Sequence, residues 1–168
     1  MPADLVSRLD LDLLYEPFLE KVLQLLANLR AKGQDFVAYS GFRSYAEQDT
    51  LHKAYISGKG GIAAPPGLSA HNYGLAVDLA RDINLVQKGL QPIWDKHEYA
   101  LLGEEAKNMG LVWGGDFNDW VHVQWPHFVT AGQLAPLRVK WMVTQKGPTQ
   151  NKSTLQEVWK LVEAQGAW

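Results

Sequence analysis

The chain has 168 residues, of which 46% are hydrophobic and 20% are charged, and this balance is typical of one globular domain with its own core. Its 16 basic and 18 acidic side chains give a formal net charge of -2 and are mixed along the sequence, so no basic field exists to hold a phosphate backbone and no nucleic-acid partner is expected. The absence of cysteine excludes disulfides and thiolate metal sites, so any metal must be held by histidine and carboxylate.

The N-terminal segment MPADLVSRLDLDLLYEPF interrupts its apolar residues with Asp, Arg and Glu, and it lacks the apolar core of a signal peptide. No run approaches the length of about 18 apolar residues that a membrane span needs. The sequence therefore predicts a chain that is made in the cytoplasm without a signal peptide and without a membrane span. If the protein acts elsewhere, something other than a classical signal must release it.

Three elements are predicted in the first third of the chain. Residues 15–32 carry apolar side chains three and four positions apart, which predicts an amphipathic helix. Residues 35–42, DFVAYSGF, predict a short strand. A second helix is expected over residues 44–58, because Ser44 followed three positions later by Glu47 has the pattern of a capping box.

The middle of the chain alternates loops, strands and one helix. Glycine and proline in residues 58–68 predict a surface loop, and GLAVDLA at residues 74–80 predicts a buried strand. A second core helix is expected over residues 95–110 and a second short strand over residues 121–125.

The C-terminal part predicts a linker at residues 145–152 and an amphipathic helix over residues 153–165, opened by a capping box of Thr154 and Glu157. Helices and strands thus mix without a βαβ rhythm, which favours an α+β fold with a small antiparallel sheet flanked by helices. We expect one domain over residues 1–136 and a C-terminal helical extension over residues 137–168 that packs on the same domain. A monomer is expected.

The segment SAHNYGLAVDLA, residues 69–80, carries the first chemical signal. Alternation along a strand places Asp78 on the same face as Gly74 and Ala76. These small residues leave room beside the carboxylate for an ion and a substrate. His71 stands in the preceding turn and can reach over the same face, so this pair has the composition of half a metal site.

The segment DWVHVQW, residues 119–125, supplies the second half. His122 opens another apolar alternating run, and together with the earlier pair it gives two histidines and one aspartate. Three protein ligands leave the fourth position of zinc for water, which is the arrangement of a catalytic site. Asp119 is left over, and a carboxylate near the water suits a general base that later delivers the proton to the leaving amine.

Three segments carry a family resemblance: SGFRSYAEQ, PGLSAHNYGLAVDLA and GLVWGGDFNDWVHVQWPHF. They resemble the successive signatures of the zinc peptidases that cut bacterial cell-wall stem peptides. This group contains the L-alanyl-D-glutamate endopeptidases, many of them phage endolysins, and the related D-alanyl-D-alanine carboxypeptidases and vancomycin-resistance dipeptidases. The resemblance covers roughly residues 35–130. Its middle signature, S-x-H-x-x-G-x-A-x-D, is specific because it fixes ligand type, spacing and the small residues between.

The resemblance implies a hedgehog/D-Ala-D-Ala-peptidase-like fold and a zinc metallopeptidase that hydrolyses the stem peptide of peptidoglycan and acts on the cell wall after release. It implies that Asp119 is the general base, that Arg43 faces the substrate carbonyl and stabilises the oxyanion, and that Ser69 lines the site. One zinc ion per chain would be held by His71, Asp78 and His122.

The same resemblance leaves an alternative ligand open. The run WPHF offers His127 as a rival to His122. Gln124 would then occupy the base position, and because a glutamine cannot take a proton, the chemistry would be lost or moved. The interpretation with Asp119 and His122 is preferred because it keeps the acid. His127 is then expected nearby, where it orients a ligand or contacts substrate.

Three tryptophans flank the predicted site, namely Trp113, Trp120 and Trp125. An aromatic wall there would hold the face of a sugar or a peptide. The alternative is that these side chains belong to the core. Both interpretations remain open.

The cleaved bond and the class of function also have alternatives. The wording of the signatures is closer to the L-alanyl-D-glutamate endopeptidases than to the carboxypeptidases. A carboxypeptidase needs a cation for the terminal carboxylate, and Lys53, Lys59 or Arg81 could supply one. A non-catalytic zinc-binding module is the alternative of a different class, since hedgehog-type domains share the fold. The retention of Asp119 and Arg43 favours the enzyme.

Overall fold

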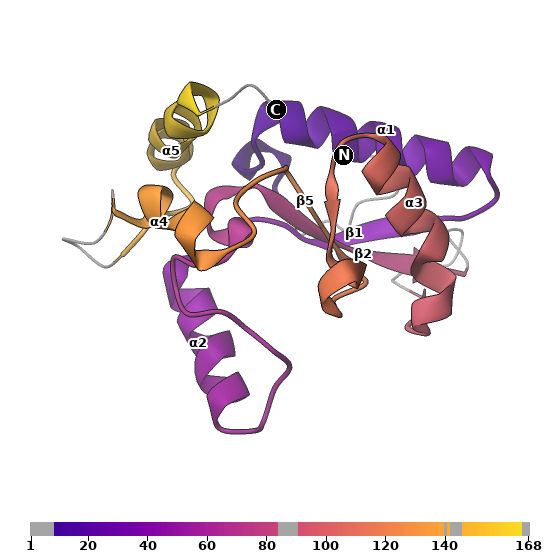
Figure 1. Ribbon diagram of the computed structural model, residues 1–168, viewed down its shortest axis with the longest axis horizontal. Helices are drawn as coiled ribbons and strands as arrows, with labels where there is room; N and C mark the ends of the chain where they lie inside the picture. The colour runs from indigo at the N-terminus through magenta and orange to yellow at the C-terminus, as the bar shows by residue number, and fades with distance from the viewer. Residues whose placement is uncertain (1–8, 84–90, 140, 142–145, 166–168) are drawn as a thin grey trace.

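The computed structural model describes residues 9–83, 91–139, 141 and 146–165. In these residues five α-helices flank a small antiparallel sheet (Figure 1), which confirms the predicted α+β architecture. The helices are α1 Glu16–Ala31, α2 Tyr45–Ile56, α3 Ala100–Asn108, α4 Ala131–Val139 and α5 Lys152–Ala164. The strands are β1 Phe36–Ser40, β2 Ala76–Asp82, β3 Pro92–Ile93, β4 Val112–Trp113 and β5 His122–Gln124. Short 3-10 helices are η1 Leu11–Leu13, η2 Ala70–Tyr73, η3 Lys96–Tyr99 and η4 Gly114–Phe117.

Strand β2 is the centre of the sheet. It pairs antiparallel with β1, β3 and β5, and β5 pairs in turn with β4. The register places Asp78 of β2 opposite Ser40 of β1 and opposite His122 of β5. Because directly opposed residues of an antiparallel pair present their side chains on one face, the sheet itself brings Asp78 and His122 together.

Helix α1 lies along the sheet and supplies much of the core (Figure 1). Its buried side chains follow the predicted spacing and are Phe18, Val22, Leu25, Leu26 and Leu29. Full burial of one such side chain contributes about 1.5–3 kcal/mol, so this stripe is a sufficient reason for the helix to stay on the sheet. Helix α3 packs beside α1 and against β4.

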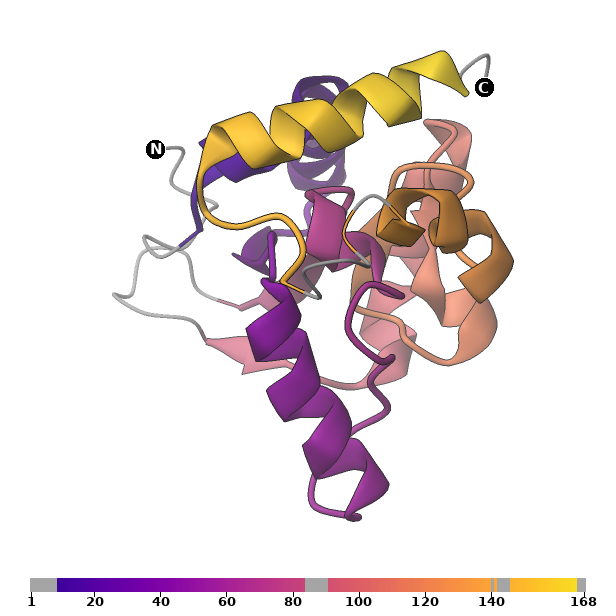
Figure 2. The same ribbon diagram turned by 90° about the vertical axis from the view of Figure 1, so that its left-hand side faces the viewer.

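Helix α2 begins with the predicted capping box. The Ser44 side chain accepts a hydrogen bond from the Glu47 amide, and the Glu47 carboxylate accepts one from the Ser44 amide. Tyr45 and Gln48 are the buried residues of this helix, and α2 projects from the rest of the fold in both views (Figures 1 and 2).

Helix α5 lies across η1 and η2 at the opposite side of the molecule from the tip of α2 (Figure 2). The predicted capping box of Thr154 and Glu157 is wrong. Asn151 caps the helix instead, accepting from the Ser153 amide, while the Thr154 hydroxyl bonds the backbone of the preceding turn. Asn151, three positions before Thr154, thus occupies the N-cap position instead of the threonine.

The underside of α5 is tied to the turn that precedes β2. Leu155, Val158, Trp159 and Val162 are buried, and the Trp159 indole N–H donates to the carbonyl of Tyr73 at 2.8 Å. Helix α4 runs through residue 136, and the division of the chain into residues 1–136 and 137–168 stays a prediction.

Helix α1, with 16 residues, is the longest of the described helices. None of the helices in the described ranges is both long enough and apolar enough to cross a bilayer.

Candidate functional site

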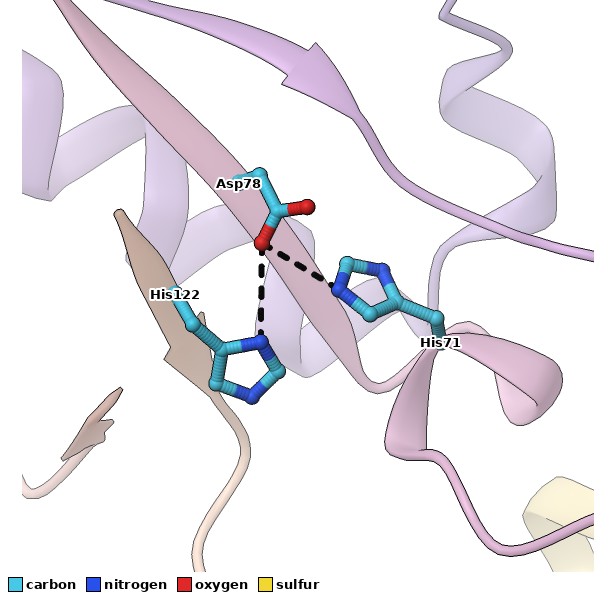
Figure 3. Close-up of side chains that lie close together, drawn as sticks. All are labelled: His71, Asp78 and His122. Carbon is cyan, nitrogen blue, oxygen red and sulfur yellow. Dashed lines mark ion pairs between the residues drawn. The ribbon is translucent and has the colours of Figure 1, made fainter. Parts of the chain in front are cut away.

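Three side chains from η2, β2 and β5 converge on one point (Figure 3): His71, Asp78 and His122. The Oδ1 atom of Asp78 lies 3.3 Å from Nε2 of His71 and 3.5 Å from Nδ1 of His122. The two rings stand edge to face with centroids 5.1 Å apart. These three residues form a possible metal site among the described residues, and His127 is not part of it.

A glycine turn delivers His71 to this point. Gly74 closes η2 in the left-handed conformation with φ of 69°, and a Cβ at this position would lie 2.3 Å from the carbonyl oxygen of Leu13. Any other residue would therefore strain the backbone and push η1 away. The small residue between the histidine and Asp78 is required by the turn.

The opposite ring nitrogen of each histidine has its own partner. Nδ1 of His71 lies 2.8 Å from the carbonyl oxygen of Gly41, and because a carbonyl can only accept, this nitrogen carries the hydrogen. Nε2 of His71 is then the atom that faces Asp78. Nε2 of His122 lies 2.8 Å from Oε1 of Gln124, so Nδ1 of His122 faces Asp78.

The arrangement fits a tetrahedral cation. An ionised carboxylate oxygen that faces two ring nitrogens requires positive charge between them, from a proton or from a metal. Ligand atoms about 2.0–2.1 Å from one zinc ion are separated by about 3.3–3.4 Å in a tetrahedron. The separations of 3.3 and 3.5 Å around Asp78 match this spacing, and histidine with carboxylate is a donor set that zinc accepts.

Electrostatics keeps Asp78 ionised and makes the histidines unequal. Burial opposes charge on Asp78, but the attraction of the two histidines outweighs it and holds the pKa of this carboxyl well below its usual range. Burial lowers the pKa of His71 despite the nearby carboxylate. Burial acts the same way on His122, but its contacts with Asp78 prevail and raise its pKa. A proton therefore competes for the His122 nitrogen in the absence of a metal.

Arg43 contacts the second carboxylate oxygen of Asp78. Its Nη2 atom lies 3.7 Å from Oδ2 of Asp78, and the guanidinium also donates to Gln48 at 3.1 Å and to Ser40 at 3.3 Å. The guanidinium of Arg43 is thus held by three side chains. Oδ1 of Asp78, the other carboxylate oxygen, faces the two histidines. The Arg43 amide donates to the carbonyl of His71 at 2.9 Å, so the backbones of these two residues are tied directly.

Asp119 lies beside the trio and not within it. Its Oδ2 atom is 3.9 Å from Nδ1 of His122, and its side chain is 52% exposed. Partial burial raises the pKa of this carboxyl, His122 counteracts the increase, and repulsion from Asp78 adds to it. The loop is held by hydrogen bonds from the Asp119 amide to Gly114 at 2.8 Å and from the His122 amide to Asp119 at 3.1 Å.

One cavity of about 760 Å³ is lined by the side chains of His71, Asp78, His122, Arg43 and Asp119. Ser69 is also part of its wall. The apolar part of the rim comes from α2, its following loop, η4 and the segment after β5, and its exposed side chains are Leu51, Ile62, Phe117 and Val129. The cavity is thus lined by polar side chains at the candidate metal site and by exposed apolar side chains at its rim.

Other residues predicted for the site lie elsewhere. Trp120, Trp125 and His127 are absent from the lining of this cavity among the described residues. Trp125 is buried and packs edge to face on Tyr15 with centroids 5.3 Å apart. Trp113 donates to the carbonyl of Trp120 at 2.8 Å. Trp125 therefore belongs to the core, and Trp113 and Trp120 contact each other outside the lining of the cavity.

The cations considered for a terminal carboxylate are also outside the lining: Lys53, Lys59 and Arg81. Arg81 faces Glu98 at 3.9 Å and lies over the ring of Phe36. Two polar partners of the ligands, the carbonyl of Gly41 and the side chain of Gln124, were not predicted as such. Alternation along β5 could have shown that Gln124 shares a face with His122.

The chain resembles known proteins in sequence and in fold. A family model described as VanY, D-alanyl-D-alanine carboxypeptidase, matches residues 12–123. The peptidoglycan L-alanyl-D-glutamate endopeptidase CwlK of Bacillus subtilis is 41% identical over an alignment of 107 residues, with a coverage of 55% of this chain and 62% of that relative. The match therefore spans less than two thirds of CwlK.

Solved structures extend the comparison to the fold. A variant of the vancomycin-resistance D,D-pentapeptidase VanY, in complex with Zn(II), aligns with a TM-score of 0.52 and 19% identity over 87% of this chain and 83% of that chain. The L-Ala D-Glu endopeptidase ChiX of Serratia marcescens aligns with a TM-score of 0.47 and 25% identity over 68% of this chain and 81% of that chain. The likeness to VanY confirms the predicted peptidase-like fold.

Proposed function

The chain belongs to the VanY family of D-alanyl-D-alanine carboxypeptidases, and from this we propose that it is a zinc-dependent peptidase of peptidoglycan stem peptides that cuts the L-Ala-D-Glu bond. The observation that carries the proposal is the meeting of the ligand trio, Asp119 and Arg43 in one cavity. A non-catalytic zinc module would need the trio alone.

One zinc ion per chain is proposed on Nε2 of His71, Oδ1 of Asp78 and Nδ1 of His122. When bound, zinc supplies Lewis-acid polarisation of the scissile carbonyl and acidification of a water molecule. The protein orients its ligands for this task through Gly41, Gln124 and Arg43, which hold the atoms not used for zinc.

Asp119 is proposed as the general base. Its carboxylate is accessible from the cavity and close to the ligands, so it can take a proton from the attacking water at Oδ2. The same oxygen then returns the proton to the leaving amine. A raised pKa suits the first step, because it makes the carboxylate a stronger base toward the attacking water.

Arg43 is proposed to stabilise the negative charge that develops on the substrate carbonyl oxygen. Its guanidinium lines the cavity and is already fixed by Ser40 and Gln48. A donor that is oriented before the reaction loses little by reorganisation, which is the basis of oxyanion stabilisation. Ser69 lines the same cavity and is proposed to contact substrate.

The choice of the L-Ala-D-Glu bond rests on two observations. CwlK, at 41% identity, is an L-alanyl-D-glutamate endopeptidase. In addition, Arg43 is the one arginine or lysine among the described residues that line the cavity, and it is engaged by Asp78. A carboxypeptidase would need a further cation for the terminal carboxylate of its substrate, so the lining favours cleavage within the peptide.

We propose that the protein works on the cell wall as a monomer after release from the cytoplasm. Residues 1–136 would form the peptidase domain, with residues 137–168 packed on it. The contacts of α5 with η1 and η2 support this arrangement, because they tie the C-terminal helix to the turn that carries His71.

Digestion of purified peptidoglycan tests the function. The zinc-loaded protein should release new amino termini of D-glutamate, detected by mass spectrometry, and a chelator should abolish them until zinc is restored. Release of terminal D-alanine alone would move the specificity to a carboxypeptidase. No cleavage by protein that still binds zinc would contradict the enzyme and favour the binding module. Asp119→Asn serves as the catalytic control.

A further inference from the structure

We propose that Gln124 is a positioning residue that selects Nδ1 of His122 as the metal-binding nitrogen, and that the left-handed turn at His127 and Phe128 orients Gln124 for this role. The inference rests on the proposed function, because it concerns a ligand of the same site. It also gives a function to the turn after β5, and this function depends on the backbone of His127 and not on its ring.

The contact is direct and buried. Oε1 of Gln124 lies 2.8 Å from Nε2 of His122, and the two residues are 3% and 7% exposed. Water is therefore a poor competitor for either group. The partner that Gln124 presents, donor or acceptor, decides the state of the imidazole.

The other end of the amide removes the ambiguity. Nε2 of Gln124 lies 3.0 Å from the carbonyl oxygen of Phe128 and 3.3 Å from that of His127. A third carbonyl, of Trp125, lies at 3.4 Å. Carbonyl oxygens only accept hydrogen bonds, so the NH2 group of the amide must face them and the oxygen must face His122.

The consequence passes to the ligand. An amide oxygen can only accept, so Nε2 of His122 must carry a hydrogen. In the neutral ring Nδ1 then keeps its lone pair, and this is the atom that faces Oδ1 of Asp78 at 3.5 Å. The hydrogen bond also fixes the rotation of the ring, which is how partners of ligand histidines commonly tune a metal site.

The backbone after β5 is shaped for this contact at a cost. His127 has φ of 75° and Phe128 has φ of 37°, and two consecutive non-glycine residues in the left-handed region are strained. The fully buried Phe128 side chain holds the turn in the core. The ring of His127 approaches Gln133 instead, with Nδ1 3.3 Å from Nε2 of that residue. It is thus the carbonyl of His127 that serves the site.

The alternative is a purely structural role, in which Gln124 only donates hydrogen bonds to the buried carbonyls after β5. Two substitutions separate the roles. Gln124→Leu removes both ends of the bridge. Gln124→Glu keeps an acceptor for the His122 hydrogen but loses the donor to Phe128, so it breaks the structural half of the bridge and preserves the positioning half.

The experiment measures zinc affinity by competition with a chromophoric chelator, and thermal stability without metal, for the full chain and these variants. Gln124→Leu should lower zinc affinity about 10- to 100-fold. Gln124→Glu should lose stability like the leucine variant and yet keep most of the zinc affinity. Nitrogen NMR of zinc-loaded protein with labelled histidine should show hydrogen on Nε2 of His122 in the parent chain.

Gln133→Leu is the matched control. Gln133 lies in the first turn of α4, and its side chain accepts hydrogen bonds from the amides of Val129 and Thr130 and approaches His127. Its loss should destabilise the start of α4 and leave zinc affinity within about twofold of the parent, since in the described contacts it bonds neither Gln124 nor a proposed zinc ligand.

The outcomes separate this inference from the proposed function. Parent-like zinc affinity in Gln124→Leu, or equal loss of affinity in the leucine and glutamate variants, would overturn the positioning role and leave the peptidase intact. Failure of the parent chain to bind zinc would overturn both. Because affinity is measured without substrate, an inactive protein that binds zinc still decides the question.

Discussion

Oδ2 of Asp119 lies 3.9 Å from Nδ1 of His122, on the side of the imidazole that faces the other ligands. Asp119 is half exposed, whereas Asp78 is largely enclosed. The two carboxylates therefore divide the work: the enclosed one is placed to hold a cation, and the open one is placed to exchange protons with water and substrate.

Asp119→Asn should remove the proton acceptor and keep the size of the side chain. We expect kcat to fall by about 10²- to 10⁴-fold, the usual worth of a general base, while zinc affinity stays close to that of the parent. Steady-state cleavage of a stem peptide, together with zinc titration, checks this. A variant that kept zinc and full activity would contradict the role given to Asp119.

Arg43→Lys should show that charge alone is insufficient. A lysine cannot reproduce the fork that reaches Ser40, Gln48 and Asp78. We expect kcat to fall by about 10²- to 10³-fold, with a smaller effect on KM. Kinetics with one peptide substrate tests this, and equal kcat in the two proteins would rule out oxyanion stabilisation by Arg43.

Removal of zinc should lower stability as well as activity. If zinc binds the folded chain as proposed, free zinc at 100 times its Kd should raise the free energy of unfolding by about 2.7 kcal/mol. Affinity should weaken at acid pH, because Asp78 raises the pKa of His122 and a proton must leave before the metal binds. Urea unfolding with and without chelator, at pH 7.5 and pH 5.5, measures both effects. A stability that ignores zinc at pH 7.5 would contradict the site.

Gly114→Ala should displace Asp119, the proposed base, without changing its side chain. A Cβ on Gly114 would lie 2.3 Å from the Asp119 carbonyl oxygen and 2.8 Å from Cβ of His122. We expect a loss of about 1–3 kcal/mol in stability and a reduced kcat. Gly132→Ala in α4, where the nearest atom lies at 3.9 Å, is the control and should be neutral or stabilising by up to about 1 kcal/mol. Equal behaviour of the two variants would refute the steric argument.

Alkaline pH should destabilise the fold through Tyr73. Burial and the hydrogen bond with Tyr45 raise the pKa of Tyr73, while an unfolded tyrosine titrates near 10. Above about pH 10 the unfolded chain therefore loses a proton that the folded chain keeps, and the free energy of unfolding falls as pH rises. Tyr73→Phe should lose about 1 kcal/mol at pH 8 with its bond to Gly67 and show a shallower decline. Urea unfolding from pH 8 to 11 would expose a parallel decline, which would exclude Tyr73 as the cause.

Local patterns predicted much of the fold. The spacing of α1 and the capping box of α2 involve residues close in sequence, so the sequence shows them directly. The strands β3 and β4 have two residues each and leave no periodicity to detect. Helix α4 contains Pro136, which argues against a helix in any sequence pattern.

The site followed the same rule. The meeting of His71, Asp78 and His122 was predictable because strand alternation and motif spacing constrain these three residues. The role of Gln124 was not, because it depends on carbonyls aimed by a strained turn. The place of Trp125 against Tyr15 likewise depends on packing between distant segments.

The position of β2 between its neighbours has a consequence for hydrogen exchange. Its amides are locked by β1, β3 and β5, so they should exchange with solvent last, at rates set by global unfolding. Asp78 is therefore expected on a segment that opens late, whereas Asp119, between η4 and β5, is expected on a segment that opens earlier. Removal of the metal should thus speed hydrogen exchange first in the loop that contains Asp119. Because the sheet stays folded, renewed metal binding should restore the site without refolding of β2.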